Sequence, residues 1–475
     1  MTMIFGRRGR SGSRDADAEP AESRPSWRRA ASATGSFDGA AAAGGARIGP
    51  ALEDETRQAE KLPALPRFSI TATDDPGEAA RSMLGGSTAK ARLALADVLG
   101  ASQPVINREQ FAGRRDTLAA LIGAIEQQRA HVVLYGERGI GKTSLVHVFS
   151  ETAREAGYLV LYGSCGVEAD FDEMFRAFTA EIPLLYHSGI SPTGNEAEHD
   201  HSFASLLGTD PVDPRELAGL WQKIVGTRVV IILDEYDRAA SPAFRRNIAE
   251  LIKNLSDRAA RVQLILTGVG SNLDELIGFT PSIRRNIVGI PVGPMAGAEL
   301  EEILSRAEQA ADLRFTPTGR EFIVRMSGGS PYLARLLGNR AAGRALDARR
   351  RTISEADVIA GTEAVLAEWN AGLPRRVQAQ LQRSEVQAEW SALIAAARAS
   401  GTPDGWFSPH DLSMEATTVV IDPETARSIL DRFTGEIDLF DREDGAQNRA
   451  LRYRFRTQGV SQLLGLSAAL ARAER

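Results

Sequence analysis

The feature that most constrains this chain is a glycine-rich segment, Gly136-Glu-Arg-Gly-Ile-Gly-Lys-Thr143, between an apolar run and a helical pattern. The apolar run, His131-Val-Val-Leu-Tyr135, predicts a buried strand. Glycines let successive backbone N–H groups face a polyphosphate, and the N-terminus of the following helix favours anions. Lys142 would reach the β- and γ-phosphates and assist catalysis there, and the Thr143 hydroxyl would bind Mg²⁺. We therefore predict nucleotide contacts from Gly136, Glu137, Arg138, Gly139, Ile140, Gly141, Lys142, Thr143 and Ser144.

Two acids end a second buried strand, in the run Val229-Val-Ile-Ile-Leu-Asp-Glu-Tyr-Asp237. At the tip of such a strand, Asp234 would hold the Mg²⁺ shell through water, and Glu235 would polarise the water that attacks the γ-phosphate. Small-molecule kinases with the same loop need no second carboxylate. The pair therefore favours hydrolysis over phosphoryl transfer to a metabolite, and Asp237 is expected to be structural or a helix cap.

A third apolar segment, Leu264-Ile-Leu-Thr-Gly-Val-Gly-Ser-Asn272, ends in polar groups. A polar side chain here would lie beside the γ-phosphate and could orient the attacking water. Thr267 and Asn272 are both candidates, and the spacing alone does not choose between them. Either could instead be a turn residue.

Strand and helix patterns alternate over residues 103–297. Short β-branched and leucine-rich runs suit strands that are buried on both faces of a parallel sheet, and the patterns between them suit crossover helices. We therefore predict an α/β fold, a P-loop NTPase core with a five-stranded parallel sheet. The segment 187–214 is rich in Gly, Pro, His and acids, and it is expected to be a surface insertion whose role the sequence does not give.

The rest of the chain divides into three further regions. Residues 1–100 are expected to be a mostly disordered tail and linker, because they offer little to bury. Residues 298–368 have wholly helical periodicity and predict a helical lid. Residues 370–475 carry helical patterns, a polar turn and the alternating run Leu451-Arg-Tyr-Arg-Phe-Arg456, which together predict a winged-helix-like domain.

Composition excludes several classes of protein. The single cysteine, Cys165, excludes an intrachain disulfide framework and any zinc site built from several cysteines. No apolar run approaches the ~20 residues that a membrane helix needs. We therefore expect a cytoplasmic protein with no membrane partner.

Taken together, the motifs resemble the AAA+/STAND branch of P-loop ATPases. The resemblance rests on Phe111-Ala-Gly-Arg-Arg-Asp116, the phosphate loop, the Leu-Asp-Glu-Tyr-Asp run ending at Asp237, and Thr267-Gly-Val-Gly. It covers roughly residues 105–365. In layout the chain is similar to origin-recognition-like initiator ATPases and to bacterial Orc-like AAA proteins.

The resemblance implies further site residues. Gly113 and Arg114 stand where the family helps to form the adenine pocket. Arg284 or Arg285, before the last strand, occupies the place of the arginine finger, which in a homo-oligomer reaches a neighbouring subunit's γ-phosphate. Gly329-Ser-Pro331 is similar to the Gly-x-Pro form of STAND NTPases, where initiators have a sensor arginine, and Arg335 follows one turn later.

These observations predict an ATP-binding switch of the AAA+/STAND class that hydrolyses ATP with Mg²⁺. Arg452, Arg454 and Arg456 share one face of the last strand, so DNA contact through a wing is a further hypothesis. The alternative is a solvated edge strand. Two rival functions stay open: a non-catalytic nucleotide-binding module that recruits DNA or protein, and a P-loop kinase. The cellular process does not follow from the sequence.

Overall fold

The structure is a computed structural model. It describes residues 87–106, 108–189, 201–270, 272–278, 281–402, 405–416, 419–435, 437–444, 451–457 and 459–473. Most of the predicted tail, and most of the predicted insertion's first half, lie outside the described residues.

The centre of the core is a parallel sheet of five strands in the order β2-β3-β4-β1-β5. This confirms the predicted α/β fold and its strand number. β1, which precedes the phosphate loop, lies between β4 and β5. The strands are β1 (His131–Gly136), β2 (Leu159–Ser164), β3 (Val229–Asp234), β4 (Val262–Val269) and β5 (Ile287–Pro291).

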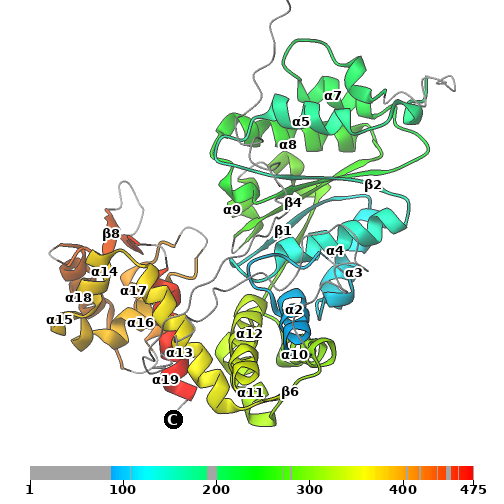
Figure 1. Cartoon of the computed structure of the whole chain (residues 1–475). Helices are drawn as coiled ribbons and strands as arrows, with labels where there is room; N and C mark the ends of the chain where they lie inside the picture. Colours follow the sequence, from blue (N-terminus) through cyan, green and yellow to red (C-terminus); the bar gives the residue numbers. More distant parts are fainter. Residues whose placement is uncertain are drawn as a thin grey trace, which may run out of the picture. The chain divides into compact units, whose positions relative to one another are not determined.

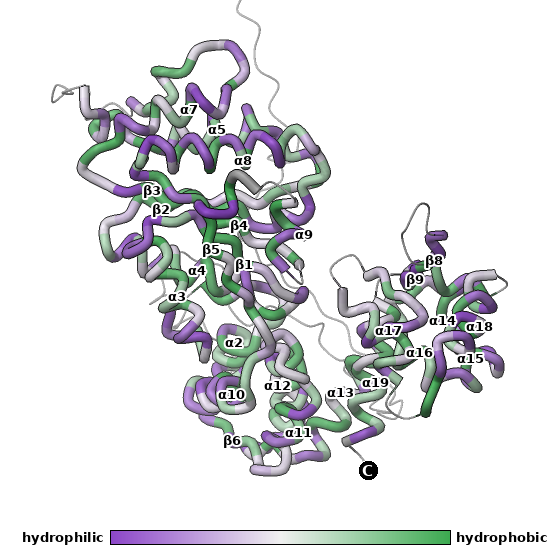
Figure 2. Tube along the Cα trace, turned by 180° about the vertical axis from the view of Figure 1, so that it is seen from behind, coloured by the Kyte–Doolittle hydropathy of each residue, from purple (hydrophilic) through white to green (hydrophobic). Residues whose placement is uncertain are grey.

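Both faces of the sheet are covered by helices (Figure 1). β3 and β4 are buried almost throughout, as their uninterrupted aliphatic runs predict, and these strands are hydrophobic in Figure 2. One face packs against α3 (Arg115–Glu126) and α4 (Lys142–Glu155). The other packs against α5 (Phe171–Ala180), α7 (Pro214–Trp221) and α8 (Pro242–Asp257). The remaining core elements are η2 (Arg108–Gln110), η3 (Leu184–Tyr186), η4 (Phe203–Leu206), η5 (Tyr236–Arg238), α9 (Leu273–Ile277) and η6 (Pro281–Asn286).

A second hydrophobic cluster lies in the helical region that follows the core. It includes the apolar faces of α10 (Gly297–Ala311), α11 (Pro317–Ser327), α12 (Pro331–Asp347) and α13 (Glu355–Gly372). A short parallel pair, β6 (Arg314–Phe315) and β7 (Thr352–Ile353), joins the loops between them.

The same cluster contains a helix that the tail prediction did not anticipate. α2 (Ser87–Leu99) packs against α10 and α12, and it buries Leu95 and Leu99. The prediction of a mostly disordered segment up to residue 100 therefore needs correction at its C-terminal end. The apolar side chains of this helix pack against residues about 200 positions further along the chain. A prediction from neighbouring residues alone does not include these contacts.

The C-terminal region has its own hydrophobic cluster, built from helices and one antiparallel hairpin. The helices before the hairpin and the long polar turn within it follow the predicted order, and the winged-helix assignment itself stays a prediction. The elements are α14 (Arg375–Leu381), α15 (Ser384–Ala388), α16 (Trp390–Ala399), α17 (Pro409–Glu415), α18 (Pro423–Thr434), β8 (Phe440–Glu443), β9 (Arg452–Phe455) and α19 (Val460–Ala473).

Among the described helices, none combines the length and the apolar character that crossing a membrane requires.

Candidate active site

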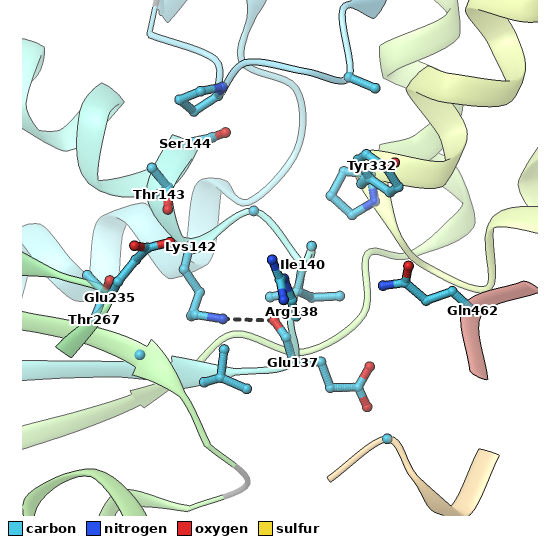
Figure 3. A pocket seen from close by; sticks show the side chains of 18 of the residues that line it. Glu137, Arg138, Ile140, Lys142, Thr143, Ser144, Glu235, Thr267, Tyr332 and Gln462 are labelled. Carbon is cyan, nitrogen blue, oxygen red and sulfur yellow. Dashed lines mark hydrogen bonds between the residues drawn. The ribbon is translucent and has the colours of Figure 1, made fainter. Parts of the chain in front are cut away.

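A pocket of about 1270 Å³ opens where β1, β3 and β4 end (Figure 3). The glycine-rich loop, the acids after β3 and the residues that end β4 all line it. Segments from outside the sheet also line it, among them residues 100–105, Phe111, Ala112, Arg114, the start of α12 and several residues between 397 and 462. The carboxyl ends of parallel strands in open α/β sheets are the usual place for a ligand.

The loop between β1 and α4 has the backbone of an anion-binding turn. Gly139 and Gly141 have φ angles of +76° and +98°, which other residues rarely adopt. A side chain at Gly136 would lie 2.3 Å from the carbonyl oxygen of Val292, so the loop passes too close to the chain after β5 for any Cβ. The predicted order of strand, loop and helix is therefore present. The nucleotide contacts assigned to its residues are an expectation that this geometry supports.

Lys142 folds back over the loop. Its Nζ donates to the carbonyl oxygens of Gly136, at 2.9 Å, and Glu137, at 2.8 Å. Burial lowers the pKa of Lys142 to about 8, although Asp237 and Asp234 act in the opposite direction. The buried ammonium thus has carbonyl acceptors but no ion pair within the described residues, and a phosphate would supply the missing charge.

Asp234 is buried and held in a fixed orientation. Its Oδ2 accepts a hydrogen bond from the Tyr162 hydroxyl at 2.7 Å, and its Oδ1 accepts from the backbone N–H of Glu235 at 2.9 Å. The Thr267 hydroxyl also donates to Oδ1. Thr143 and Asp234 both line the pocket. A hydroxyl and a carboxylate are oxygen donors of the kind that Mg²⁺ prefers, so these residues fit the ion.

Glu235 has an unusual backbone and two side-chain partners. Its φ is +53°, in the left-handed region, which turns the chain sharply after β3. One carboxylate oxygen accepts from Arg238 Nη1 at 2.7 Å and from Ser164 Oγ at 3.3 Å. Glu235 lines the pocket while engaged in these contacts.

The two polar candidates, Thr267 within β4 and Asn272 after it, lie in different surroundings. Thr267 is fully buried and lines the pocket. Asn272 is not among the lining residues; its side chain caps α9 by accepting from the backbone N–H of Glu275 at 3.1 Å. The geometry therefore favours Thr267 beside the phosphates and gives Asn272 the turn role that the sequence left open.

Gly113 and Arg114 connect the core with α10. The backbone N–H of Gly113 donates to Glu302 at 3.2 Å, and that of Arg114 donates to Glu299 at 2.5 Å. Arg114 also donates to the carbonyl oxygen of Ile140, in the phosphate loop, at 3.1 Å. Of the two, Arg114 lines the pocket and Gly113 does not.

The start of α12 brings three residues to the pocket: Pro331, Tyr332 and Arg335. The Pro331 ring lies 3.5 Å from the place of a Cβ on Gly141. Arg335 is 8% exposed and has no ion pair among the described residues. Burial lowers its pKa to about 10. A buried cation without an acid partner is costly, so this one favours an anionic ligand.

The arginine-finger candidates lie away from the pocket of their own chain. Arg284 pairs with Asp274 at 3.0 Å, and Arg285 lies 3.8 Å from Asp257 with most of its side chain exposed. Neither lines the pocket. Their role toward a second subunit stays a prediction.

The three arginines proposed for DNA contact all face acids. In the β8–β9 hairpin, Arg452 pairs with Glu443 at 2.8 Å, and Arg454 pairs with Asp441 at 3.2 Å. Arg456 also pairs with Asp441, at 2.9 Å. The charges of this face are thus compensated within the hairpin, as in a solvated edge strand. DNA contact would require these pairs to be exchanged for phosphates, and it stays a prediction.

Sequence reasoning missed three residues around the acids, Tyr162, Ser164 and Arg238, and one pocket residue at the start of α12, Tyr332. Val160, Tyr162 and Ser164 share one face of β2, and Ser164 lies opposite Asp234. The period-two pattern of β2, combined with the expectation that β2 and β3 are neighbours, is the signal that could have found the first two. Tyr332 follows the predicted Pro331 directly and could have been included with it.

A phosphate loop between β1 and α4, paired acids at the end of β3 and a polar side chain near the end of β4 are the arrangement of a P-loop NTPase core. Residues 110–266 match the family model described as the AAA ATPase domain. This match confirms the resemblance over about a third of the chain. The search among curated proteins found no match.

Solved structures resemble the chain at low identity. The ORC1 protein of Aeropyrum pernix in complex with DNA is 14% identical, with a TM-score of 0.41, over 80% of this chain and 97% of that one. The RuvB Holliday junction branch migration motor of Thermotoga maritima is 17% identical, with a TM-score of 0.39, over 75% and 96%. A Walker-type ATPase of Pyrococcus abyssi is 16% identical, with a TM-score of 0.43, over 76% and 98%.

Proposed function

We propose that this chain binds ATP with Mg²⁺ in the pocket and hydrolyses it to ADP and phosphate, as a molecular switch. One observation carries the proposal: Lys142 at the start of α4, Asp234 at the end of β3 and Glu235 directly after it line the same pocket. Buried Arg335 from α12 lines it as well. Two desolvated cations and two carboxylates at one place suit a polyphosphate and its divalent ion.

Binding would use the backbone N–H groups of the phosphate loop and the cationic side chains that line the pocket. The loop N–H groups and the dipole at the start of α4 face the phosphates. Lys142 would exchange its two carbonyl acceptors for phosphate oxygens. The negative charge of the phosphates would then offset the cost of burying the ammonium group. Arg335 would approach the phosphates from α12. Arg114 and Pro331, with Gly113 behind Arg114, would shape the pocket for the base.

Hydrolysis would depend on Glu235 and Thr267. Glu235 is the carboxylate that would orient water and accept its proton, and to do so it would have to leave Arg238 and Ser164. Thr267 would orient the same water or the γ-phosphate. Thr143 and Asp234 would hold the metal, Asp234 through water. Bound Mg²⁺ would neutralise charge that develops on the phosphate oxygens.

The variant Glu235→Gln separates hydrolysis from mere binding. We expect steady-state phosphate release to fall by a factor of about 100 or more, because a general base contributes that much, while nucleotide affinity changes little. Glu181→Gln, at an exposed glutamate that ends α5, is the matched control and should keep wild-type turnover. Equal turnover in the two variants would overturn the role of Glu235 in hydrolysis, and no turnover in the wild type would support the non-catalytic module. ADP release that needs a small acceptor would support the kinase.

Exposed Arg285 extends the proposal to a nucleotide-dependent homo-oligomer, in which it would reach a neighbour's γ-phosphate. In that case Arg285→Ala should lower turnover at high protein concentration and leave ATP affinity intact. Sedimentation with and without ATP measures the assembly directly. Turnover that does not depend on protein concentration, with a single sedimenting species, would argue for a monomeric switch.

A further inference from the structure

The Asp234 carboxylate accepts from donors on three sides, and one of them belongs to no predicted motif. Glu235 N–H and the Thr267 hydroxyl both bond Oδ1. The Tyr162 hydroxyl, at 2.7 Å, is the one donor to Oδ2 among the described residues. A carboxylate has about four acceptor positions on its two oxygens. Three are filled here, so the carboxylate has little freedom to rotate.

Tyr162 is itself fixed by the elements around it. It lies on β2 opposite Ile232 of β3, so that Ser164, two residues later, lies opposite Asp234. The Tyr162 ring stacks on the imidazole of His147, with ring centroids 4.8 Å apart and planes 29° apart. His147 lies on α4, four residues after Thr143, and therefore on the same side of that helix as the predicted metal-binding hydroxyl.

The Tyr162 hydroxyl donates to Asp234, and the neighbour of its ring in the stack is His147. Burial lowers the pKa of His147 despite the nearby Asp234 charge, so the imidazole is uncharged near neutral pH. The stack thus adds no charge beside the carboxylate.

We propose that Tyr162, braced by His147, is a positioning residue that orients the Asp234 carboxylate toward the magnesium side of the pocket. The inference rests on the proposed function and names a residue that the motifs do not. Mg²⁺ demands near-ideal octahedral geometry and keeps several waters, so a carboxylate that binds it through water must present its free lone pair in one direction. Tyr162 restrains Oδ2, which leaves the remaining acceptor position for that water.

The test is the Mg²⁺ dependence of nucleotide binding in the full chain. N-methylanthraniloyl-ATP is titrated with MgCl₂ at fixed protein concentration, and its affinity is also measured in EDTA. In Tyr162→Phe we expect the Mg²⁺ concentration for half-saturation to rise by a factor of about 10, because loss of an outer-shell partner typically costs 10- to 100-fold in metal affinity. Affinity in EDTA should stay at the wild-type value, since the phosphate loop is untouched.

Two further variants make the test specific. Tyr158→Phe removes a hydroxyl from another tyrosine beside the same hydrophobic cluster and should behave as wild type. His147→Ala keeps the Tyr162 hydroxyl but removes its stacking partner, and it should raise the Mg²⁺ requirement by a smaller factor than Tyr162→Phe.

The outcomes separate this inference from the proposed function. If wild type binds the nucleotide and Tyr162→Phe has the same Mg²⁺ half-saturation, the positioning role is overturned while the proposed function stands. An equal rise in Tyr158→Phe would overturn it too, because the effect would then reflect packing in general. If wild type binds no nucleotide with or without Mg²⁺, the proposed function fails, and the inference that rests on it fails with it.

Discussion

At the scale of single residues, burial sets the charge state of the cations around the pocket. Lys142 is 9% exposed and Arg335 is 8% exposed, and neither has a carboxylate partner among the described residues. Desolvation lowers the pKa of both, to about 8 and about 10 respectively. A folded chain keeps such charges at a cost to stability, which an anionic ligand can offset when it binds.

Lys142 makes nucleotide affinity depend on pH. In the free protein its pKa of about 8 means that it loses its proton as the pH rises through 8, whereas bound phosphates would hold the proton on. Binding above pH 8 must therefore take up a proton. We expect ATP affinity to fall by a factor of about 10 between pH 7 and pH 9. Lys142→Arg keeps its charge over this range and should show a flat profile. A flat profile in wild type would contradict the argument.

We expect Arg335 to lower the stability of the folded chain and to strengthen ATP binding. Arg335→Met keeps an apolar stem but removes the buried charge, so the nucleotide-free protein should melt at a higher temperature. ATP affinity should fall by a factor of about 10 to 100, the usual worth of a hydrogen bond to a charged group. Arg344→Met, on the exposed side of α12, is the control and should change neither quantity. A lower melting temperature with unchanged ATP affinity would mean that Arg335 is purely structural.

Spacing alone predicted the loop and the acids because each lies where a strand ends. It could not choose between Thr267 and Asn272, since both lie near the carboxyl end of β4. The choice depends on where the chain turns into α9, whose first backbone N–H groups take the Asn272 side chain as a cap. Spacing along the chain did not indicate Tyr162 either, because its hydrogen bond to Asp234 joins two neighbouring strands, β2 and β3.

At the scale of elements, α2 belongs to the helical region that follows the core. Its buried side chains join those of α10 and α12 in one cluster, although these helices are far apart in the sequence. α2 is followed directly by residues 100–105, which line the pocket. Packing of α2 thus holds one wall of the pocket.

Leu99→Ala tests this packing. Leu99 is fully buried, and truncation of a buried leucine costs about 2–5 kcal/mol. We expect a clearly lower thermal midpoint and, because residues 100–105 follow directly, weaker ATP binding. Val420→Ala, at a side chain that is 99% exposed, should leave both unchanged. A wild-type midpoint in Leu99→Ala would show that α2 does not stabilise the region.

The elements differ in how far the sequence predicts them. The core strands were predictable because a strand buried on both faces must be almost continuously apolar, as β3 is. α2 was not, because an alanine-rich helix of 13 residues is marginal by itself and forms through tertiary packing. For the β8–β9 hairpin, the alternating pattern of the sequence shows the arginines of one strand but not the acids with which they pair. Their acids lie on the other strand, across the turn, and the register decides the pairing.

At the scale of the whole molecule, the pocket connects the core with the helical region. Glu299 and Glu302 of α10 hold the backbone of Arg114 and Gly113, and Pro331 and Arg335 of α12 line the pocket opposite the phosphate loop. A nucleotide that contacts both would tie the two regions together. Its binding should therefore stabilise the chain in proportion to RT ln(1 + [ATP]/Kd), which gives about 2.7 kcal/mol at 100 times Kd.

The most direct test of the central claim, that this pocket binds ATP, is a calorimetric titration of MgATP into the full chain and into Lys142→Ala. We predict saturable binding to wild type and affinity weaker by a factor of about 10 to 100 in the variant, because a charged donor to the phosphates is lost. Absence of saturable binding to wild type, or equal affinity in the two proteins, would contradict the account.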